Sequence, residues 1–440
     1  MKDKTIDMTG QEMYNFAGRI FPINRSITGS GVRETLNIIK EIHDELEIKA
    51  YPTGMQAFDW NVPKEWNVNE AYIENSKGDR IIDFKENNLH VLGYSIPVDE
   101  YVDLENLKKY IYTEKEQPDA IPYVTSYYKE RFGFCMSENL KNSLVEDTYH
   151  MYIDSTLSEG ELNYGEMVIN GTTDDEIIIS TYVCHPSMAN NECSGPALAV
   201  ALMDYIKSLI KEGEGARYTY RFLFVPESIG SISYMSQNLA HMKAHVKAIF
   251  VLSCVGDNND YSIIHSRYGK TLADKVLTNV LKYHYKDYSD YSYLQRGSDE
   301  KHYNAPGVDL PAVAFCRSKY GEFKEYHTSE DNMDYISPEG FDGAFDVMKQ
   351  VIDALEYNYY YRIKTLCEPQ LGKRGLFPDL SRKGQYDKVA TLRNFIGYAD
   401  GLNDIIDISE IIRVPVKEII PVVDKLKEND LLDVYEKVNR

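Results

Sequence analysis

Two histidines and one glutamate occupy positions that could serve a metal-dependent hydrolase. His185 follows the apolar run Glu176–Val183 within STYVCHPSMANNECSG, where a strand is expected to end. Glu227 follows a second apolar run in FLFVPESIG, and His327 lies in the turn-rich segment GEFKEYHTSEDNMDYIS. Neutral imidazole is the commonest zinc ligand, and a nearby carboxylate can take a proton from water. Alternatively, Glu227 is an acidic residue at the start of a helix, where the helix dipole favours a negative charge.

An alternation of strands and helices surrounds these residues from about position 150. It predicts an α/β layered domain with a mixed sheet, whose strand ends would gather the three side chains. Strands are expected at Tyr152–Ser155, Leu162–Asn170, Glu176–Val183, Tyr218–Val225, Lys247–Leu252, Ser262–His265 and Ala312–Cys316, and helices at Pro196–Ile210, Ile229–Leu239, Lys270–Tyr283 and Pro338–Tyr360.

The chain before this domain has a different character. Helical patterns cover Gly10–Ile20 and Gly31–Leu46, with Ser30 as the expected N-cap of the second helix. Between about residues 55 and 128, short apolar runs, turns and aromatic loops predict a small β-rich insertion with one helix near Leu104–Tyr112.

The last segment has the pattern of a winged helix-turn-helix. Residues 371–385 are expected to form a linker, and helices are expected at Tyr386–Tyr398, from Asp407 and near Pro415, before a short strand in LLDVYE. DNA reading needs a basic recognition face, yet residues 386–440 hold 8 Lys and Arg against 11 Asp and Glu. We therefore expect this segment to dock a protein or to be structural.

Composition narrows the classes of partner. At 440 residues the chain is longer than a domain with one ordinary hydrophobic core. Its formal charge of −21 argues against nucleic acid and anionic membranes as binding partners. No window approaches the roughly 20 apolar residues of a membrane span, so we expect no membrane partner and a cytoplasmic location. The six cysteines lack CxxC spacing and are expected to be reduced thiols. Cys184 and Cys193 flank the histidine motif, which keeps a nucleophilic cysteine as an alternative.

The segments around the two histidines and the glutamate resemble the metal-site motifs of co-catalytic zinc aminopeptidases and carboxypeptidases. The chain more closely resembles a bacterial family of aminopeptidase-like proteins with an inserted lid and a C-terminal winged helix, often associated with polysaccharide biosynthesis. The stretches that carry this resemblance are FPINRSITGSGVRETL, FDWNVPKEW, IPYVTSYYKERFGFC, GSDE, YHTSEDN and CEPQLGKRGLF. It implies a zinc-exopeptidase-like, three-layer α/β domain with a mixed sheet from residues 1–51 and 131–370, a β-rich lid from 52–130, and a winged helix from 380–440.

The resemblance also implies roles for individual residues. His185 and His327 match the first and last zinc histidines, and Glu227 matches the general base. Asn191 stands at the position of the metal-bridging aspartate, and Ser228 stands where the zinc peptidases have a second glutamate.

A further ligand aspartate is also missing, because the segment Leu252-Ser253-Cys254 offers none. Two close divalent cations need several carboxylates to offset their repulsion. We therefore expect a single zinc ion, held by His185, His327 and a third donor that is either Asn191 or the neighbouring Glu192.

Substrate contacts are expected from two further places. Asp299 and Glu300 in RGSDEKHYNAPG resemble a loop that lines such sites and could bind an α-ammonium group, although an exposed acidic loop is an equal alternative. Arg317, just past a strand, could meet an anionic group.

The leading interpretation is a zinc-dependent aminopeptidase-like amide or peptide hydrolase, linked to polysaccharide biosynthesis. Its expected substrate is a peptide, an aminoacyl compound or an amino sugar. The alternative is a non-catalytic protein that keeps the pocket for a ligand and docks a partner through the winged helix. A homo-oligomer is a further expected association.

Overall fold

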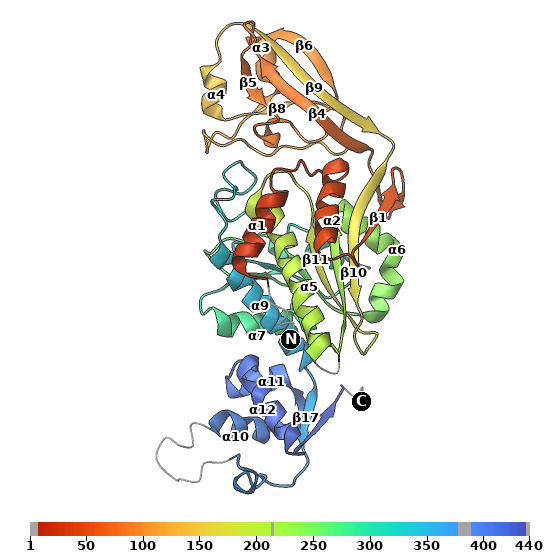
Figure 1. The fold of residues 1–440 in the computed structure, drawn as a ribbon, viewed down its shortest axis with the longest axis vertical. Coiled ribbons are helices and arrows are strands. Elements are labelled where there is room, and N and C mark those ends of the chain that lie inside the picture. Colours follow the sequence, from red (N-terminus) through yellow and green to blue (C-terminus); the bar gives the residue numbers. More distant parts are fainter. Residues whose placement is uncertain (1–7, 213–214, 377–388, 437–440) are drawn as a thin grey trace. The chain divides into compact units, whose positions relative to one another are not determined.

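The computed structural model describes residues 8–212, 215–376 and 389–436 (Figure 1). The chain divides into two compact units, one formed by Met1–Gly269 with Asp290–Phe345 and the other by Lys270–Ser289 with Asp346–Arg440. The expected division into domains at 1–51 with 131–370, 52–130 and 380–440 stays a prediction.

A mixed eight-stranded sheet forms the core of the first unit, which confirms the α/β fold expected from the sequence. Its central strands β12, β11, β13 and β16 run parallel, while β1, β10 and β14 pair antiparallel with their neighbours. The order across the sheet is β1 (Glu47–Pro52), β10 (Glu161–Ile169), β12 (Thr219–Val225), β11 (Glu176–Tyr182), β13 (Val246–Leu252), β16 (Ala312–Cys316), β14 (Ser262–Ile264) and β15 (Ser289–Tyr291).

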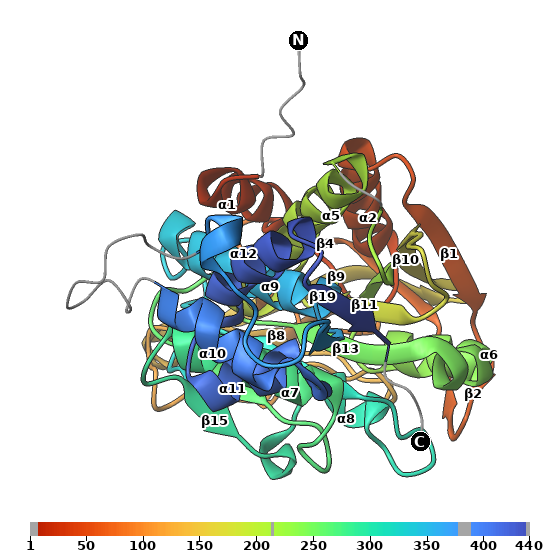
Figure 2. The ribbon, with the colours of Figure 1, turned by 90° about the horizontal axis from the view of Figure 1, so that it is seen from below.

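Helices cover both faces of this sheet, because its inner strands are apolar on both sides and every residue of β11 is buried. On one face lie α1 (Gly10–Ile20), α2 (Ser30–Ile42) and α5 (Ser194–Glu212), and on the other lie α6 (Ile229–His245) and α8 (Glu300–Tyr303), as Figure 2 shows. The stretch Ala189–Ile210 is apolar and long enough to span a membrane, but it is 72% buried, as expected of a core helix. The N-cap of α2 is Gly29 rather than the expected Ser30.

Most of the expected β-rich insertion belongs to a second, four-stranded sheet in the order β5 (Arg80–Asp83), β4 (Glu65–Glu74), β9 (Thr148–Ser158) and β6 (Val98–Asp103). The strand expected near Tyr152 in the α/β alternation is β9, which pairs with β4 and β6 instead. Shorter elements complete this region: β2 (Gln56–Ala57), β3 (Trp60–Asn61), α3 (Leu104–Leu107), β7 (Ile111–Tyr112), β8 (Phe134–Cys135) and α4 (Glu138–Ser143). The helix expected over Leu104–Tyr112 is thus shorter than its sequence pattern.

The second unit combines a helix from the middle of the chain with the C-terminal elements. It contains α7 (Leu272–His284), most of α9 (Pro338–Glu356), β17 (Tyr360–Ile363), α10 (Ala390–Tyr398), β18 (Asp400–Asp404), α11 (Ile405–Ile412), α12 (Val416–Glu428) and β19 (Leu432–Tyr435). The strands form a sheet in the order β18-β17-β19. Of the expected linker, residues 377–385 lie outside the described residues, as do residues 386–388 of the helix expected at Tyr386–Tyr398.

Candidate active site

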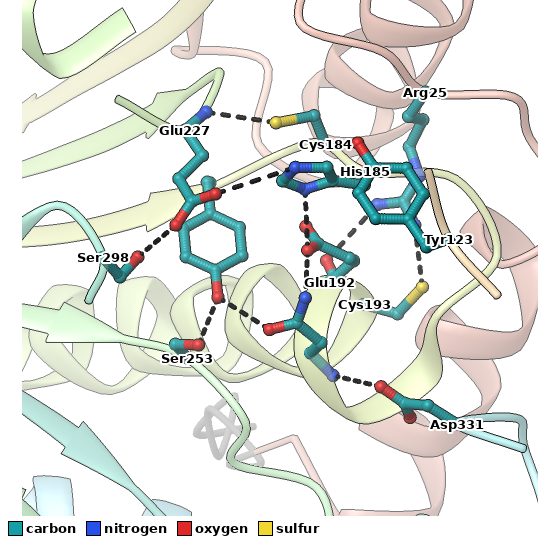
Figure 3. A network of polar contacts seen from close by, with 12 residues as sticks. Arg25, Tyr123, Cys184, His185, Glu192, Cys193, Glu227, Ser253, Ser298 and Asp331 are labelled. Atoms are coloured by element: carbon teal, nitrogen blue, oxygen red, sulfur yellow. Dashed lines mark hydrogen bonds and ion pairs between the residues drawn. The ribbon is translucent and has the colours of Figure 1, made fainter. Parts of the chain in front are cut away.

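Two neighbouring parallel strands bring His185 and Glu227 together. β11 and β12 stay in register to their last pair, Tyr182 with Val225, and each is followed within a few residues by one of these side chains. His185 Nε2 and Glu227 Oε2 lie 3.7 Å apart (Figure 3). The strand pattern in the sequence therefore located the point where these two groups meet.

Glu192 holds the other nitrogen of the His185 ring. Its Oε1 accepts a hydrogen bond from His185 Nδ1 at 2.9 Å, which leaves Nε2 as the ring nitrogen that can bind a proton or a cation. Glu192 is fully buried, and its second oxygen, Oε2, has no hydrogen-bond partner among the described residues. Because a buried carboxylate oxygen without a partner is costly, this oxygen indicates that a cation or a donor belongs beside it.

A single turn of π-helix, Ala189–Cys193, presents Glu192 to the pocket. Such turns are frequent at functional sites. Arg25, fully buried, fixes this turn: Nη1 donates to the backbone carbonyl of Glu192 at 3.3 Å and Nη2 donates to Cys193 Sγ at 2.9 Å. The arginine thus sets the position of the carboxylate through its backbone.

The side-chain oxygen of Asn191 is engaged away from the histidine. Tyr182 donates its hydroxyl to Asn191 Oδ1 at 3.1 Å, and the Cys254 thiol donates to the same oxygen at 3.5 Å. The Tyr182 hydroxyl also bonds Ser253, and the Asn191 amide nitrogen donates to Glu192 Oε1. Two neutral groups therefore donate to Asn191 Oδ1, and Glu192 offers the carboxyl group beside His185, although burial raises the pKa of Glu192.

Asp331 anchors the same turn from the His327 loop. Its carboxylate accepts from the backbone N–H groups of Asn190 and Asn191 at 2.7 and 3.0 Å. Burial raises the pKa of Asp331 to about 7, although these two bonds act in the opposite direction. Sequence reasoning did not identify this residue as part of the site, because nothing local links it to a turn 140 positions earlier.

Glu227 is oriented by contacts at its side chain and its backbone. Ser298 Oγ donates to Glu227 Oε1 at 2.7 Å, and the Glu227 N–H donates to Cys184 Sγ at 3.1 Å. The next residue, Ser228, has a φ of 63° and donates its N–H to Asp299 Oδ1 at 2.8 Å. With 23% of its side chain exposed, Glu227 is both fixed and reachable by a ligand.

His327 lies beside His185, and the centroids of the two rings are 5.9 Å apart. The ring centroid of Tyr123 lies 4.6 Å from that of His185 and 5.2 Å from that of His327. The backbone N–H of Tyr123 donates to the His327 carbonyl at 2.8 Å. Burial lowers the pKa of His327 to about 3, so its imidazole is in the neutral, ligating form. Sequence reasoning assigned IPYVTSYY to short strands and so missed Tyr123 and Tyr127, whose ring is 6.3 Å from His185.

The pocket favours a positive charge. Burial alone would lower the pKa of His185, but the neighbouring Tyr127 and Glu192 outweigh burial and raise the pKa well above its usual value. Donor atoms of Cys184, His185 and Glu192 all lie within 4.8 Å of one another. The unpaired Glu192 oxygen beside His185 fits a cation site, which Cys184 could join only by losing its proton. Burial raises the pKa of the Cys184 thiol, which argues against a nucleophilic thiolate.

The predicted substrate contacts lie deeper than expected. Asp299 and Glu300 are both fully buried, so neither forms an exposed acidic loop. Asp299 Oδ1 accepts from the Ser231 hydroxyl at 2.8 Å, and burial raises the pKa of Asp299 to about 7. Glu300 Oε1 accepts from the Gly297 N–H at 2.8 Å and the Tyr320 hydroxyl at 2.6 Å. Both carboxyl groups therefore position the loop that carries Ser298.

Arg317 is not brought into this cluster. Its guanidinium is buried over the ring of Tyr261, at 3.8 Å from the centroid, and donates to the Gly340 carbonyl and to Asn258 Oδ1, each at 2.8 Å. These contacts join the end of β16 to the start of α9. The expected contact with an anionic substrate group is not supported by this position.

Comparisons with known proteins match this architecture. Residues 14–358 match a family described as a domain of unknown function, DUF4910, and residues 358–434 match a winged helix-turn-helix family. Over 404 residues the chain is 42% identical to a Clostridium acetobutylicum protein named for polysaccharide biosynthesis with an aminopeptidase-like domain, and the match covers 91% of each chain. The expected winged helix is thereby confirmed.

Solved structures agree with the fold. The crystal structure of a candidate peptidase from Clostridium acetobutylicum superposes with a TM-score of 0.90 at 40% identity, covering 97% of this chain and 96% of that one. A zinc aminopeptidase from Bacillus subtilis superposes with a TM-score of 0.56 at 13% identity, covering 78% and 94%. At this identity the second likeness shows the fold alone, which is aminopeptidase-like as expected.

Proposed function

Because the chain belongs to the family described as domain of unknown function DUF4910 and has an aminopeptidase-like fold, we propose that it is an amide hydrolase with a single zinc ion. His185 and His327 would hold the ion, and Glu192 rather than Asn191 would supply the balancing carboxylate. Bound there, zinc would polarise the carbonyl group of the substrate.

The observation that carries this proposal is the unpaired, fully buried Oε2 of Glu192 beside His185. Such an oxygen suits a cation site, and the carboxylate–histidine pair is the arrangement that orients a metal-binding imidazole. Because a neutral tyrosine and a neutral cysteine donate to the Asn191 oxygen, a second ion beside it would lack the carboxylates it needs.

The remaining steps fall to the chain's own side chains. Glu227 would accept a proton from the attacking water and pass it to the leaving amine, with its Oε1 held by Ser298. Tyr123 and Tyr127 would cover the substrate and limit access of bulk water. The name of the Clostridium acetobutylicum relative points to polysaccharide biosynthesis, so the substrates we favour are amides of amino sugars, beside aminoacyl and peptide amides.

Zinc analysis tests the metal part of the proposal. Protein purified without chelator should carry about one zinc per chain, and His185→Ala and His327→Ala should lose it. Glu192→Gln should weaken zinc binding by about 10- to 100-fold. Exposed Glu146→Gln provides the matched control. Equal zinc in all variants would refute the site.

Activity is tested separately on a panel of aminoacyl, peptide and N-acyl amino-sugar amides. Glu227→Gln should retain zinc and lose turnover, because it keeps the shape of the side chain but not its basicity. A second candidate function, non-catalytic ligand binding with partner docking through the winged helix, is favoured by the amide at position 191. Turnover by the wild-type chain would exclude it, whereas turnover only in Asn191→Asp would support it.

A further inference from the structure

Two cavities lie next to each other against the loop Phe21–Asn24, apart from the His185–Glu227 contact. The first has about 350 Å³ and is bounded by this loop, residues 84–88 and Ser187. The second has about 360 Å³ and is bounded by the same loop, the start of α2 and Trp66–Val68. They share Pro22 and Asn24 as a common wall. Each volume reaches the range of about 300–1,000 Å³ that small-ligand sites occupy.

Neutral polar residues are the majority in the lining of the first cavity, whereas the second is lined by a mixture of polar and apolar residues. The first is rich in amides and hydroxyls, which can each donate and accept hydrogen bonds: Asn24, Asn87, Asn88, Asn332, Ser187 and Ser329. Its only charged lining residues among those described, Lys85 and Glu86, have opposite signs, and the second cavity adds Glu34. This lining lacks the cluster of cations that a phosphate or a nucleotide would need.

Asn88 lines the first cavity with a carboxamide whose hydrogen-bonding capacity is not satisfied. Its side chain lines the cavity, is only 7% exposed, and has an Oδ1 without a hydrogen-bond partner among the described residues. Its amide nitrogen makes only a long bond of 3.4 Å to the Pro22 carbonyl. Because buried amide oxygens are rarely left unpaired, a rotation of the enclosed Asn88 carboxamide toward the cavity would let this oxygen accept a hydrogen bond from a ligand.

We propose that the two cavities form one groove that binds a neutral oligosaccharide of at least two sugar units. Sugar hydroxyls both donate and accept, which matches amide and serine side chains, and the half-buried rings of Phe21 and Phe84 offer flat faces for the apolar side of a sugar ring. Two adjoining cavities of similar size suit a chain of repeating units better than one compact metabolite.

The groove borders the candidate active site without containing it. Ser187 lies two residues after His185, and Ser329 lies two residues after His327. A saccharide in the groove would thus contact the loops that carry His185 and His327 through Ser187 and Ser329. The binding proposal stands without zinc or catalysis, because none of the proposed polar contacts involves His185, Glu192 or Glu227.

Saturation-transfer NMR on the full chain tests the groove directly. The probes are cellobiose, maltose and N,N′-diacetylchitobiose, with tri-alanine as a peptide and glucose 6-phosphate as an anionic competitor. We expect at least one neutral disaccharide to bind, and Asn24→Ala and Asn88→Ala each to weaken it by about fivefold or more, as expected for one lost hydrogen bond. Exposed Asn69→Ala is the matched control.

Asn24 is partly exposed, so its variant should fold even where Asn88→Ala does not. Glu227→Gln should bind the disaccharide like the wild type, which separates this result from the fate of the hydrolase proposal. The groove proposal is overturned by absence of binding for every neutral disaccharide, by equal binding in Asn24→Ala, or by binding of tri-alanine or the phosphate alone.

Discussion

At the scale of single residues, exchanging Asn191 for aspartate tests how the pocket balances charge. The Asn191 amide now donates to Glu192 Oε1, whereas an aspartate would place two carboxylates in contact inside a buried site. We expect Asn191→Asp to melt below the wild type in chelator and to gain more stability than the wild type when zinc is added, because like charges repel until a cation joins them.

Thermal melts with and without zinc measure this difference, and the exposed Asn69→Asp exchange controls for added charge alone. If zinc shifts the melting temperatures of Asn191→Asp and the wild type equally, the carboxylate of Glu192 is not part of a cation site.

His302 makes stability depend on pH. Burial lowers its pKa to about 4 in the folded chain, against about 6.5 when exposed, and its Nε2 is buried without a partner among the described residues. The pKa of His302 is lower in the folded chain than in the unfolded chain, so the unfolded chain binds a proton first as the pH falls. The contribution of neutral His302 to folding stability is therefore complete above about pH 6.5 and is lost as the pH falls towards 4. The loss is at most about 1.4 kcal/mol per pH unit.

Urea unfolding at pH 7 and pH 5 checks this, with His302→Gln as the variant. Titration of the acidic groups changes the free energy of unfolding of both proteins equally. Between these pH values, the wild type should therefore lose about 1–2 kcal/mol more unfolding free energy than His302→Gln. Equal losses would mean that His302 is solvated or paired in solution.

At the scale of elements, Gly195 sets how closely α5 approaches the sheet. A Cβ at this position would lie 2.2 Å from Thr181 Oγ1 on β11 and 2.6 Å from the Leu252 carbonyl on β13. Gly195→Ala should therefore cost about 1–3 kcal/mol of unfolding free energy by overpacking. Gly397→Ala in α10, where a Cβ meets nothing within 4 Å, should be neutral or slightly stabilising. Denaturant unfolding of both variants tests the contrast.

The elements that were predictable from sequence are those with long, regular apolar patterns. The expected strands at Glu176–Val183 and Tyr218–Val225 correspond to β11 and β12, and their carboxyl ends place His185 and Glu227 next to each other. Tertiary pairing overrode local pattern elsewhere. β9 belongs to the second sheet. The α-helix from Leu104 ends at Leu107, and a 3-10 turn over Lys108–Tyr110 leads to Ile111 and Tyr112, which pair with β8.

Contacts between distant segments could not be predicted in this way. Asp331 meets the π-turn, and Tyr123 meets both histidines, through loops whose spacing carries no periodic signal. The choice between Asn191 and Glu192 was equally hidden, because adjacent side chains in an irregular turn can point either way. The neutral partners of the Asn191 oxygen are the reason that we propose Glu192.

At the scale of the whole molecule, the charge of the winged helix predicts no DNA binding. On α12 the exposed cations Lys417, Lys425 and Lys427 are interspersed with the exposed anions Glu418 and Glu428. A mixed face of this kind cannot neutralise a row of phosphates. Fluorescence anisotropy of the full chain with duplex DNA should show no binding at low salt. A steep decrease of affinity with salt would identify a phosphate-binding face and contradict this expectation.

The composition of the second unit predicts that the winged helix is not a removable appendage. α7 belongs to this unit although it lies in the middle of the sequence. Its Asn279 donates to Ser409 at 3.0 Å and to Glu410 at 2.6 Å. Ending the chain at residue 357 would leave that buried amide without these partners and expose the face of α7 that packs on α11.

We therefore expect the chain truncated at 357 to unfold at lower urea and to aggregate, and Asn279→Ala in the full chain to cost about 1–3 kcal/mol, because Ser409 and Glu410 lose their donor. Lys417→Ala, on the exposed face of α12, is the matched control and should cost little. Soluble yield and urea unfolding measure both effects. A truncated chain as stable as the full one, with a silent Asn279→Ala, would mean that α7 folds without the tail and that the second unit is two independent parts.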